Sequence, residues 1–258
     1  MRIAVLQAGA VNGDVAANLQ RIGMAAAEAS LQDATLLIAP ELATTGYGAG
    51  DAIQSLAEAP DGPQATTLRQ IARDNGLAIV TGFAERGDDG KLYNSALFVD
   101  STGPRACYRK CQLWGPYERA LFTAGPPEAV CVNYGGIKIG LLICYDVEFP
   151  ERVRALARAG ADLIAVPTAT PSGEAARFIS SRMIPVRAFE NQLFIAYANH
   201  HGHDGRFAYA GSSCIAAPDG GDLARAEEAG DAFLLADIDP GAFAQSRAEN
   251  PYLNDLTG

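Results

Sequence analysis

The sequence is poor in the features that mark several classes of protein. It has five cysteines, an odd number without a Cys-x-x-Cys pair, and its 258 residues can form a hydrophobic core without disulfide staples. No segment has the long uncharged apolar run of a membrane helix. The opening MRIAVLQAGA predicts a first strand rather than the longer apolar region of a signal peptide. We therefore expect a soluble cytoplasmic protein.

Basic residues are also in short supply. Twenty Lys and Arg stand against thirty Asp and Glu, which gives a formal net charge of −10 at pH 7. A field of this sign repels nucleic acid and anionic membranes at long range, so neither is expected as a partner. The glycines of GYGAGD also lack the spacing of a nucleotide-binding loop. A small neutral or cationic substrate fits these observations better.

Apolar runs that alternate with helical patterns predict an α/β protein. Strands are expected at 2–8, 34–40, 77–85, 91–100, 105–113, 129–133, 137–143, 161–167, 193–199, 211–217 and 232–238. Helices are expected at 14–30, 64–76, 150–160 and 174–191, the last interrupted by Pro185. Strands that are apolar on both faces need helices on both sides, and neighbouring strand pairs indicate mixed sheets. With no linker or repeat, residues 1–258 are expected to form one domain of two sheets with helices outside.

Three polar residues end apolar strands, where ligands of open α/β sheets bind. Glu41 ends TLLIAPE, Lys110 ends RACYRK and Cys144 ends IKIGLLIC. A free thiol has a pKa of roughly 8.5, and the acids near Cys144 oppose its ionisation. The thiol therefore needs a base from another segment of the chain. Glu41 can take the thiol proton while Lys110 stabilises a negative intermediate. The alternative is a buried structural cysteine with two solvated charges, the structural role we assign to the other four cysteines.

All three histidines lie in NHHGHD, residues 199–204. This stretch leaves two rival hypotheses, a metal site or a Cys–His pair with Cys144. A metal site needs further ligands in fixed geometry, and the adjacent His200 and His201 tend to point apart, so no metal is predicted.

Three motifs resemble those of the nitrilase, or carbon–nitrogen hydrolase, superfamily. They are APELATTGY with Glu41, YRKCQLW with Lys110 and LLICYDVEFPE with Cys144, and the resemblance extends over nearly the whole chain. It implies a four-layer αββα sandwich, a Glu–Lys–Cys triad, and a second glutamate at Glu118 in GPYERALFTAG that positions the lysine. It also implies a homodimer and a reaction without a metal or organic cofactor.

The sequence departs from the family pattern at two places. Gln112 stands where many relatives carry histidine, which leaves the hydrogen bonding beneath the lysine open. Nitrilases usually read Cys-Trp-Glu at the nucleophile, whereas this chain reads Cys-Tyr-Asp at residues 144–146. The second difference favours an amide over a nitrile substrate.

The expected reaction is therefore hydrolysis of small aliphatic or amino-acid-derived carboxamides through a cysteine thioester. The backbone N–H of Tyr145 joins Lys110 as an oxyanion donor. From their positions after the motifs, Tyr47 and Thr168 are expected to contact the substrate. Two alternatives stay open. One is an N-carbamoyl or ω-amide hydrolase, in which Arg177 or Arg206 binds the substrate carboxylate, and the other is a non-catalytic scaffold.

Overall fold

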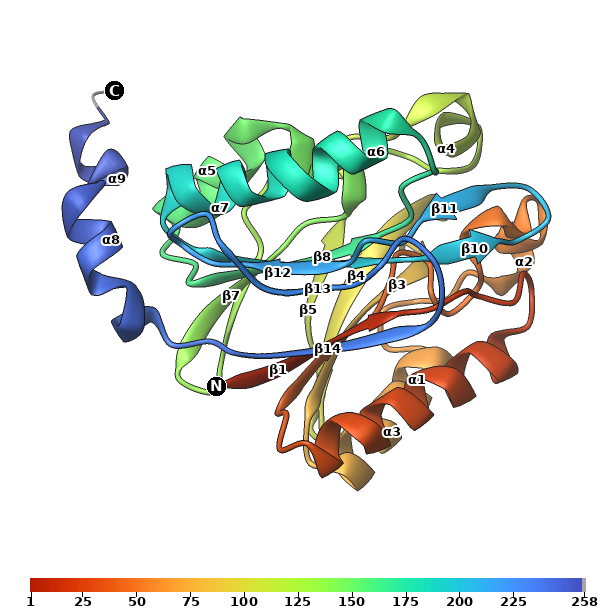
Figure 1. Ribbon diagram of the computed structural model, residues 1–258. Coiled ribbons are helices and arrows are strands. Elements are labelled where there is room, and N and C mark those ends of the chain that lie inside the picture. The colour runs from red at the N-terminus through yellow and green to blue at the C-terminus, as the bar shows by residue number, and fades with distance from the viewer. Residues whose placement is uncertain (257–258) are drawn as a thin grey trace.

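The computed structural model describes residues 1–256, which form two six-stranded mixed sheets flanked by helices (Figure 1). The first sheet has the order β14 (Ala232–Asp237), β1 (Arg2–Gln7), β2 (Leu36–Ile38), β3 (Ala78–Arg86), β4 (Leu92–Asp100), β5 (Gly103–Arg109). The second has the order β13 (Asp222–Arg225), β12 (Cys214–Ala216), β9 (Phe194–Asn199), β8 (Leu163–Thr168), β7 (Ile137–Leu141), β6 (Cys131–Tyr134). A separate hairpin joins β10 (His201–His203) and β11 (Ala208–Ala210). The expected αββα sandwich is confirmed.

Each sheet has three parallel strands at its centre and antiparallel strands at both sides. In the first sheet β1, β2 and β3 run parallel, and in the second β7, β8 and β9 do. The sheets stack face to face, with β1 against β9 and β3 against β8. Parallel central strands place their carboxyl ends together, which is where the polar residues of the motifs follow.

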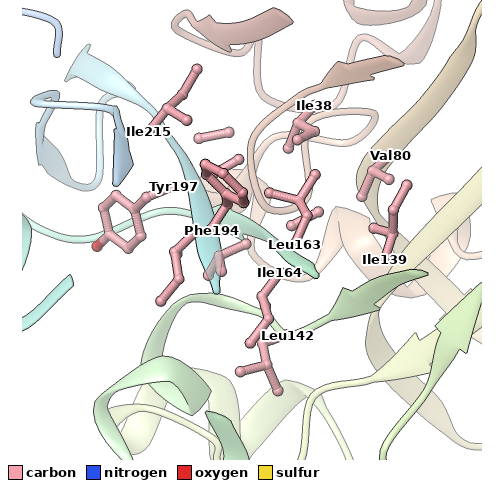
Figure 2. Packing of buried hydrophobic residues seen from close by; sticks show 14 of the residues in the cluster. Ile38, Val80, Ile139, Leu142, Leu163, Ile164, Phe194, Tyr197 and Ile215 are labelled. Atoms are coloured by element: carbon pink, nitrogen blue, oxygen red, sulfur yellow. The ribbon is translucent and has the colours of Figure 1, made fainter. Parts of the chain in front are cut away.

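The core explains why the strands are apolar on both faces. In β1, Ile3 and Val5 point into the layer between the sheets, whereas Ala4 and Leu6 pack under the outer helices. Figure 2 shows part of the inner layer, in which Ile38 and Val80 of the first sheet lie near Ile139 and Leu163 of the second. The period-two alternation of a strand therefore fills two cores at once.

Helices cover both outer faces. The first sheet is covered by α1 (Val15–Leu31) and α3 (Pro63–Asn75), and the second by α5 (Pro150–Arg158), α6 (Glu174–Phe178) and α7 (Ile184–Asn191) (Figure 1). Shorter helices are α2 (Ala52–Leu56), α4 (Gly115–Leu121), α8 (Ala244–Glu249) and α9 (Tyr252–Asp255). Asp14 begins α1 by accepting a hydrogen bond from the N–H of Ala17 at 2.9 Å. Within residues 1–256 no helix has the length and apolarity that crossing a bilayer requires.

Most expected elements agree with the structure to within two residues at each end, and three strands end differently for a physical reason. The strand expected at 105–113 is β5 and ends at Arg109, because α4 begins six residues later. The strand expected at 211–217 shrinks to β12, since Gly211 and Ser212 have positive φ angles of 58° and 52°. The strand expected to run to Ile143 ends at Leu141, so Cys144 begins a separate 3₁₀ turn, Cys144–Glu148.

The helix expected at 174–191 is irregular, but the irregularity precedes Pro185. A π-helical turn at Ile179–Met183 separates α6 from α7, and Pro185 lies in the first turn of α7. Proline lacks the N–H that an α-helix needs there, and a wider turn before it accommodates that loss.

Candidate active site

Glu41 enters the site from the loop after β2. Its side chain is completely buried, and its backbone N–H donates to the carbonyl of Thr168 in the second sheet at 3.3 Å. Gly82 of β3 packs directly against this loop, because a Cβ at residue 82 would lie 2.6 Å from the Cα of Glu41 and 2.2 Å from the nitrogen of Leu42. Leu42 itself has a φ of 48°. The loop therefore holds the carboxylate in a backbone geometry that leaves it little freedom.

Lys110 follows β5 and joins two buried carboxylates. Its Nζ lies 2.7 Å from Glu41 Oε1 and 2.6 Å from Glu118 Oε1, and all three side chains are enclosed. Asn94 of β4 donates its side-chain N–H to the same Glu41 oxygen at 2.7 Å. Within the described residues no group hydrogen-bonds the other oxygen, Glu41 Oε2. One oxygen of Glu41 is thus fixed by two donors and the other is left to accept a proton.

Glu118 lies on α4, and its carboxylate accepts hydrogen bonds from three donors. Tyr47 donates its hydroxyl to Oε1 at 2.8 Å, and the backbone N–H of Trp114 donates to Oε2 at 2.8 Å. With Lys110 on Oε1, both oxygens of Glu118 are used. This carboxylate therefore orients the lysine and has no oxygen free for proton transfer.

Cys144 begins the 3₁₀ turn with a φ of 43°, which is rare for a residue other than glycine. Asp146 stabilises the turn by accepting the N–H of Ile143 at 3.2 Å and that of Gln112 at 2.8 Å. The hydroxyl of Thr170 lies 3.5 Å from the sulfur and 2.5 Å from the hydroxyl of Tyr197. Because Asp146 binds the backbone of residue 112, the exchange of histidine for Gln112 leaves this contact in place.

The electrostatics of the site favour a neutral thiol and a titratable base. Burial, and next the charge of Glu41, raise the pKa of Cys144, while Lys110 lowers it less. Burial raises the pKa of Glu41 to about 7 against the opposing effect of Lys110. Burial also opposes the charge of Lys110, yet Glu118 and Glu41 together hold its pKa well above the usual value. The thiol therefore needs a base, and Glu41 titrates where a base is effective.

A cavity of about 250 Å³ opens onto the sulfur. It is lined by Tyr47, Trp114, Glu118, Cys144, Tyr145, Glu148, Ala169, Thr170, Pro171, Ser172, Gly173, Ala175, Ala176 and Ile179. A cavity of this size admits only a small substrate.

With this geometry established, comparison with known proteins decides the family. The sequence matches the family described as carbon-nitrogen hydrolase over residues 2–248. The chain belongs to the carbon–nitrogen hydrolase family. This result, with the amidases among its relatives, confirms the expected superfamily and the expected class of enzyme, an amide-hydrolysing carbon–nitrogen hydrolase.

This carbon–nitrogen hydrolase is 45% identical to the hydrolase in the pqqF 5′ region of Pseudomonas protegens, a match that covers 99% of this chain and 88% of that one. It is 36% identical to an (R)-stereoselective amidase from Pseudomonas sp., covering 99% and 91%. Among solved structures, an amidase from Nesterenkonia sp. superposes with a TM-score of 0.88 at 36% identity, covering 99% of this chain and 93% of that chain. In structures of that amidase, acrylamide adds to the active-site cysteine and butyramide binds a cysteine variant.

The residues expected at the site of the hydrolase do not all reach the cavity. Tyr47 and Tyr145 line it, and Tyr47 also supports Glu118. Thr168 does not line it, because its hydroxyl donates back to the carbonyl of Val166 at 2.9 Å. Thr168 contributes instead through its carbonyl, which accepts the N–H of Glu41.

Neither arginine considered for a substrate carboxylate lines the cavity. Arg177 is exposed and lies 3.3 Å from Glu228, whereas Arg206 donates to the carbonyl of Gly48 at 3.2 Å. Their positions give no support to the hypothesis that they bind a substrate carboxylate.

The three histidines do not converge. His200 is buried with its ring nitrogens 2.8 Å from the carbonyl of Ala8 and 2.7 Å from that of Glu41, while His201 contacts Asp231. Burial lowers the pKa of His200. Within residues 1–256 no group of three or more His, Cys, Asp or Glu side chains is arranged to hold a metal ion. His200 thus supports the backbone of the Glu41 loop.

Sequence reasoning missed four residues of the site: Asn94, Asp146, Thr170 and Glu148. Asn94 left one usable signal, since an Asn-Ser pair interrupts the otherwise apolar strand KLYNSALFVD. Thr170 and Glu148 left none, because the contact of Thr170 with the sulfur and the place of Glu148 in the cavity wall depend on how the segments after β7 and β8 fold.

Proposed function

We propose that this hydrolase cleaves small aliphatic or amino-acid-derived carboxamides to a carboxylic acid and ammonia through a thioester on Cys144. One observation carries the proposal, the buried group of Glu41, Lys110 and Glu118, in which the charges of Glu41 and Lys110 act on the Cys144 thiol. A second one supports it, since Glu41 Oε2 has no hydrogen-bond partner in residues 1–256 and is the oxygen that would receive the thiol proton.

In the first half of the reaction, Glu41 takes the proton of Cys144 as the sulfur attacks the carbonyl carbon. The C–S bond forms, and the carbonyl oxygen becomes an oxyanion held by the ammonium of Lys110 and the backbone N–H of Tyr145. Donors of this kind are each worth about 3 kcal/mol of barrier. Protonated Glu41 then donates its proton to the amide nitrogen, the C–N bond breaks and ammonia leaves.

In the second half, Glu41 takes a proton from water, whose oxygen attacks the thioester carbon. The C–S bond breaks, the acid leaves, and the sulfur recovers its proton from Glu41. Because the base must be deprotonated at the start of each turnover, kcat/KM is expected to rise as the pH passes about 7, the pKa of Glu41. A flat profile from about pH 4 to pH 10 would exclude Glu41 as the base.

The alternative of an N-carbamoyl or ω-amide substrate receives no support from the cavity. Such substrates carry a carboxylate, and the cavity lining contains Glu118 and Glu148 but no Lys, Arg or His. A scaffold without activity would not need the enclosed ion group, which is costly to bury unless fully paired. The homodimer stays a prediction, which light scattering would test.

The proposal is tested by replacing the nucleophile and a matched cysteine. Cys144→Ala is expected to lower ammonia release from butyramide by roughly 10³-fold or more, because the bond-forming atom is lost. Cys214→Ala is the control, since Cys214 is an equally buried free cysteine away from the cavity and is expected to change the rate little. Intact-mass analysis of the enzyme during turnover is expected to show an acyl adduct that Cys144→Ala lacks. Unchanged turnover in Cys144→Ala would overturn the proposal.

A further inference from the structure

Glu148 is the acidic residue of the cavity wall that the proposed mechanism does not use. It ends the same 3₁₀ turn that Cys144 begins, and both side chains line the cavity. The other acid of the lining, Glu118, is fully engaged by Lys110, Tyr47 and Trp114. For the carboxylate of Glu148, by contrast, residues 1–256 provide no hydrogen-bond or ion-pair partner, and the side chain lines the cavity that the substrate would enter.

The two cations whose charges act on Glu148, Lys110 and Arg187, both have other partners. Arg187 of α7 donates to the backbone carbonyls of Glu148 and Val147 at 2.8 and 3.2 Å, and its third contact is with Glu190 at 2.9 Å. The guanidinium therefore fixes the backbone at the end of the turn without pairing with the Glu148 carboxylate. Burial raises the pKa of Glu148 to about 7, while Lys110 and Arg187 oppose the rise. A cationic partner would stabilise the ionised form of this partly buried carboxyl group.

The side chains that line the cavity carry a net negative charge. The lining has two carboxylates and no basic side chain, and the ammonium of Lys110 is shared between Glu41 and Glu118. A substrate that carries a carboxylate would be repelled by these carboxylates in a partly desolvated space. A substrate that brings an ammonium would find a carboxylate ready to pair with it.

We propose that Glu148 is a specificity residue that pairs with the ammonium group of amino-substituted carboxamides and excludes amides that carry a carboxylate. The inference rests on the proposed function, because it assumes that an amide carbon lies at Cys144. It narrows the substrate class to small amides with a protonated amine on the acyl side.

The test uses substrates that differ only in charge. Butyramide and 3-aminopropanamide have the same shape, with a terminal methyl in one and an ammonium in the other, and pentanamide and 4-aminobutanamide form a longer pair. Succinamate supplies the anionic analogue of the shorter pair. In at least one pair the amino amide is expected to have a kcat/KM about tenfold above that of its neutral isostere, the size of one ion pair in a partly buried site.

In the variant Glu148→Gln, the ratio of kcat/KM for the amino amide to that for its neutral isostere is expected to fall to about one. Glu148→Lys is expected to reverse the preference and to raise activity on succinamate. Glu151→Gln, which removes the same charge from an exposed position three residues later, is the control and is expected to keep the wild-type preference. The far-UV circular dichroism spectrum of Glu148→Gln, compared with that of the wild type, reports whether the variant is folded.

A readout on the wild-type enzyme makes the test independent of the variants. The ratio of kcat/KM for the amino amide to that for its isostere is expected to rise with pH through about 7, as Glu148 ionises. The titration of Glu41 affects both substrates alike and cancels in the ratio. A ratio near one at every pH, or an equal loss on both substrates in Glu148→Gln, would overturn the inference. Failure of the proposed function gives a different result from failure of this inference. In that case Cys144→Ala would not reduce the hydrolysis of either substrate.

Discussion

The two sheets bring side chains of different character to the same point. The first sheet supplies Glu41 and Lys110, which are charged, completely enclosed and joined at 2.7 Å. The second supplies Cys144 and Thr170, which are uncharged and line the cavity. The buried ion group of the candidate site thus comes from one side, and the thiol at the cavity wall comes from the other. Substrate preference can therefore change in the second sheet without disturbing the ion group of the first.

The strongest way to break this division is to remove the cation of the first sheet. In Lys110→Met, Glu41 and Glu118 are left buried without a counterion, which is expected to cost about 3–5 kcal/mol of unfolding free energy at pH 8. Loss of the proposed oxyanion donor is expected to reduce kcat/KM for butyramide by about 10³-fold. Urea denaturation and ammonia release measure the two effects. Lys138→Met is the control, because the side chain of Lys138 donates to the carbonyl of Ala159 at the surface. Wild-type stability in Lys110→Met would contradict the role given to the lysine.

A smaller effect is expected from displacing the Glu41 loop without changing any charge. In Gly82→Ala the new methyl group would clash with the backbone of Glu41 and Leu42, so stability is expected to fall by about 1–3 kcal/mol. The rate is expected to fall as well, because the base moves relative to the thiol. Gly23→Ala in α1 is the matched control. Its methyl would meet Ile71 at an ordinary 3.6 Å, and alanine favours a helix. Equal thermal stability of the two variants would count against the close packing at residue 82.

The smallest effect concerns the second sheet and appears in the pH dependence of stability. The pKa of Glu148 is about 7 in the folded protein and 4.5 ordinarily, so between these values the unfolded chain releases a proton that the folded protein keeps. Wild-type stability therefore declines as the pH rises through this window. Glu148→Gln removes that part of the decline, and its stability relative to wild type is expected to increase from pH 5 to pH 8. The urea midpoints of both proteins at these two pH values measure this difference in stability. Glu151→Gln is expected to leave the slope unchanged, and an equal slope in Glu148→Gln would refute the interpretation.

Much of this arrangement follows from local sequence. The apolar runs predicted most strands, and polar residues just beyond three of them pointed to Glu41, Lys110 and Cys144 as candidates. Strand ends meet at one edge of each sheet, and the stacked sheets bring the two edges together. Glu118 came from the resemblance alone, since nothing in GPYERALFTAG distinguishes it from a surface acid. Thr168 shows the limit of counting along a strand, as its hydroxyl turns back onto Val166.

What sequence could not predict depends on contacts between distant segments. Asn94 reaches Glu41 across 53 positions, and Tyr47 reaches Glu118 across 71. The unpaired state of Glu148 depends on Arg187 being held by carbonyls, which no local pattern encodes. The interruption expected at Pro185 lies before it, as the π-helical turn at Ile179–Met183, because the backbone adjusts on the N-terminal side of the proline.

The pairing of β14 with β1 has a consequence for how the molecule is made. Arg2 of β1 lies opposite Asp237 of β14 (Figure 1). During synthesis, β1 therefore cannot form this pairing until β14 has been made. Until residues 232–237 leave the ribosome, one edge of the sheet that carries Glu41 offers unpaired amide and carbonyl groups to any neighbouring chain. Nascent chains stalled before this point are expected to be the species that chaperones must shield.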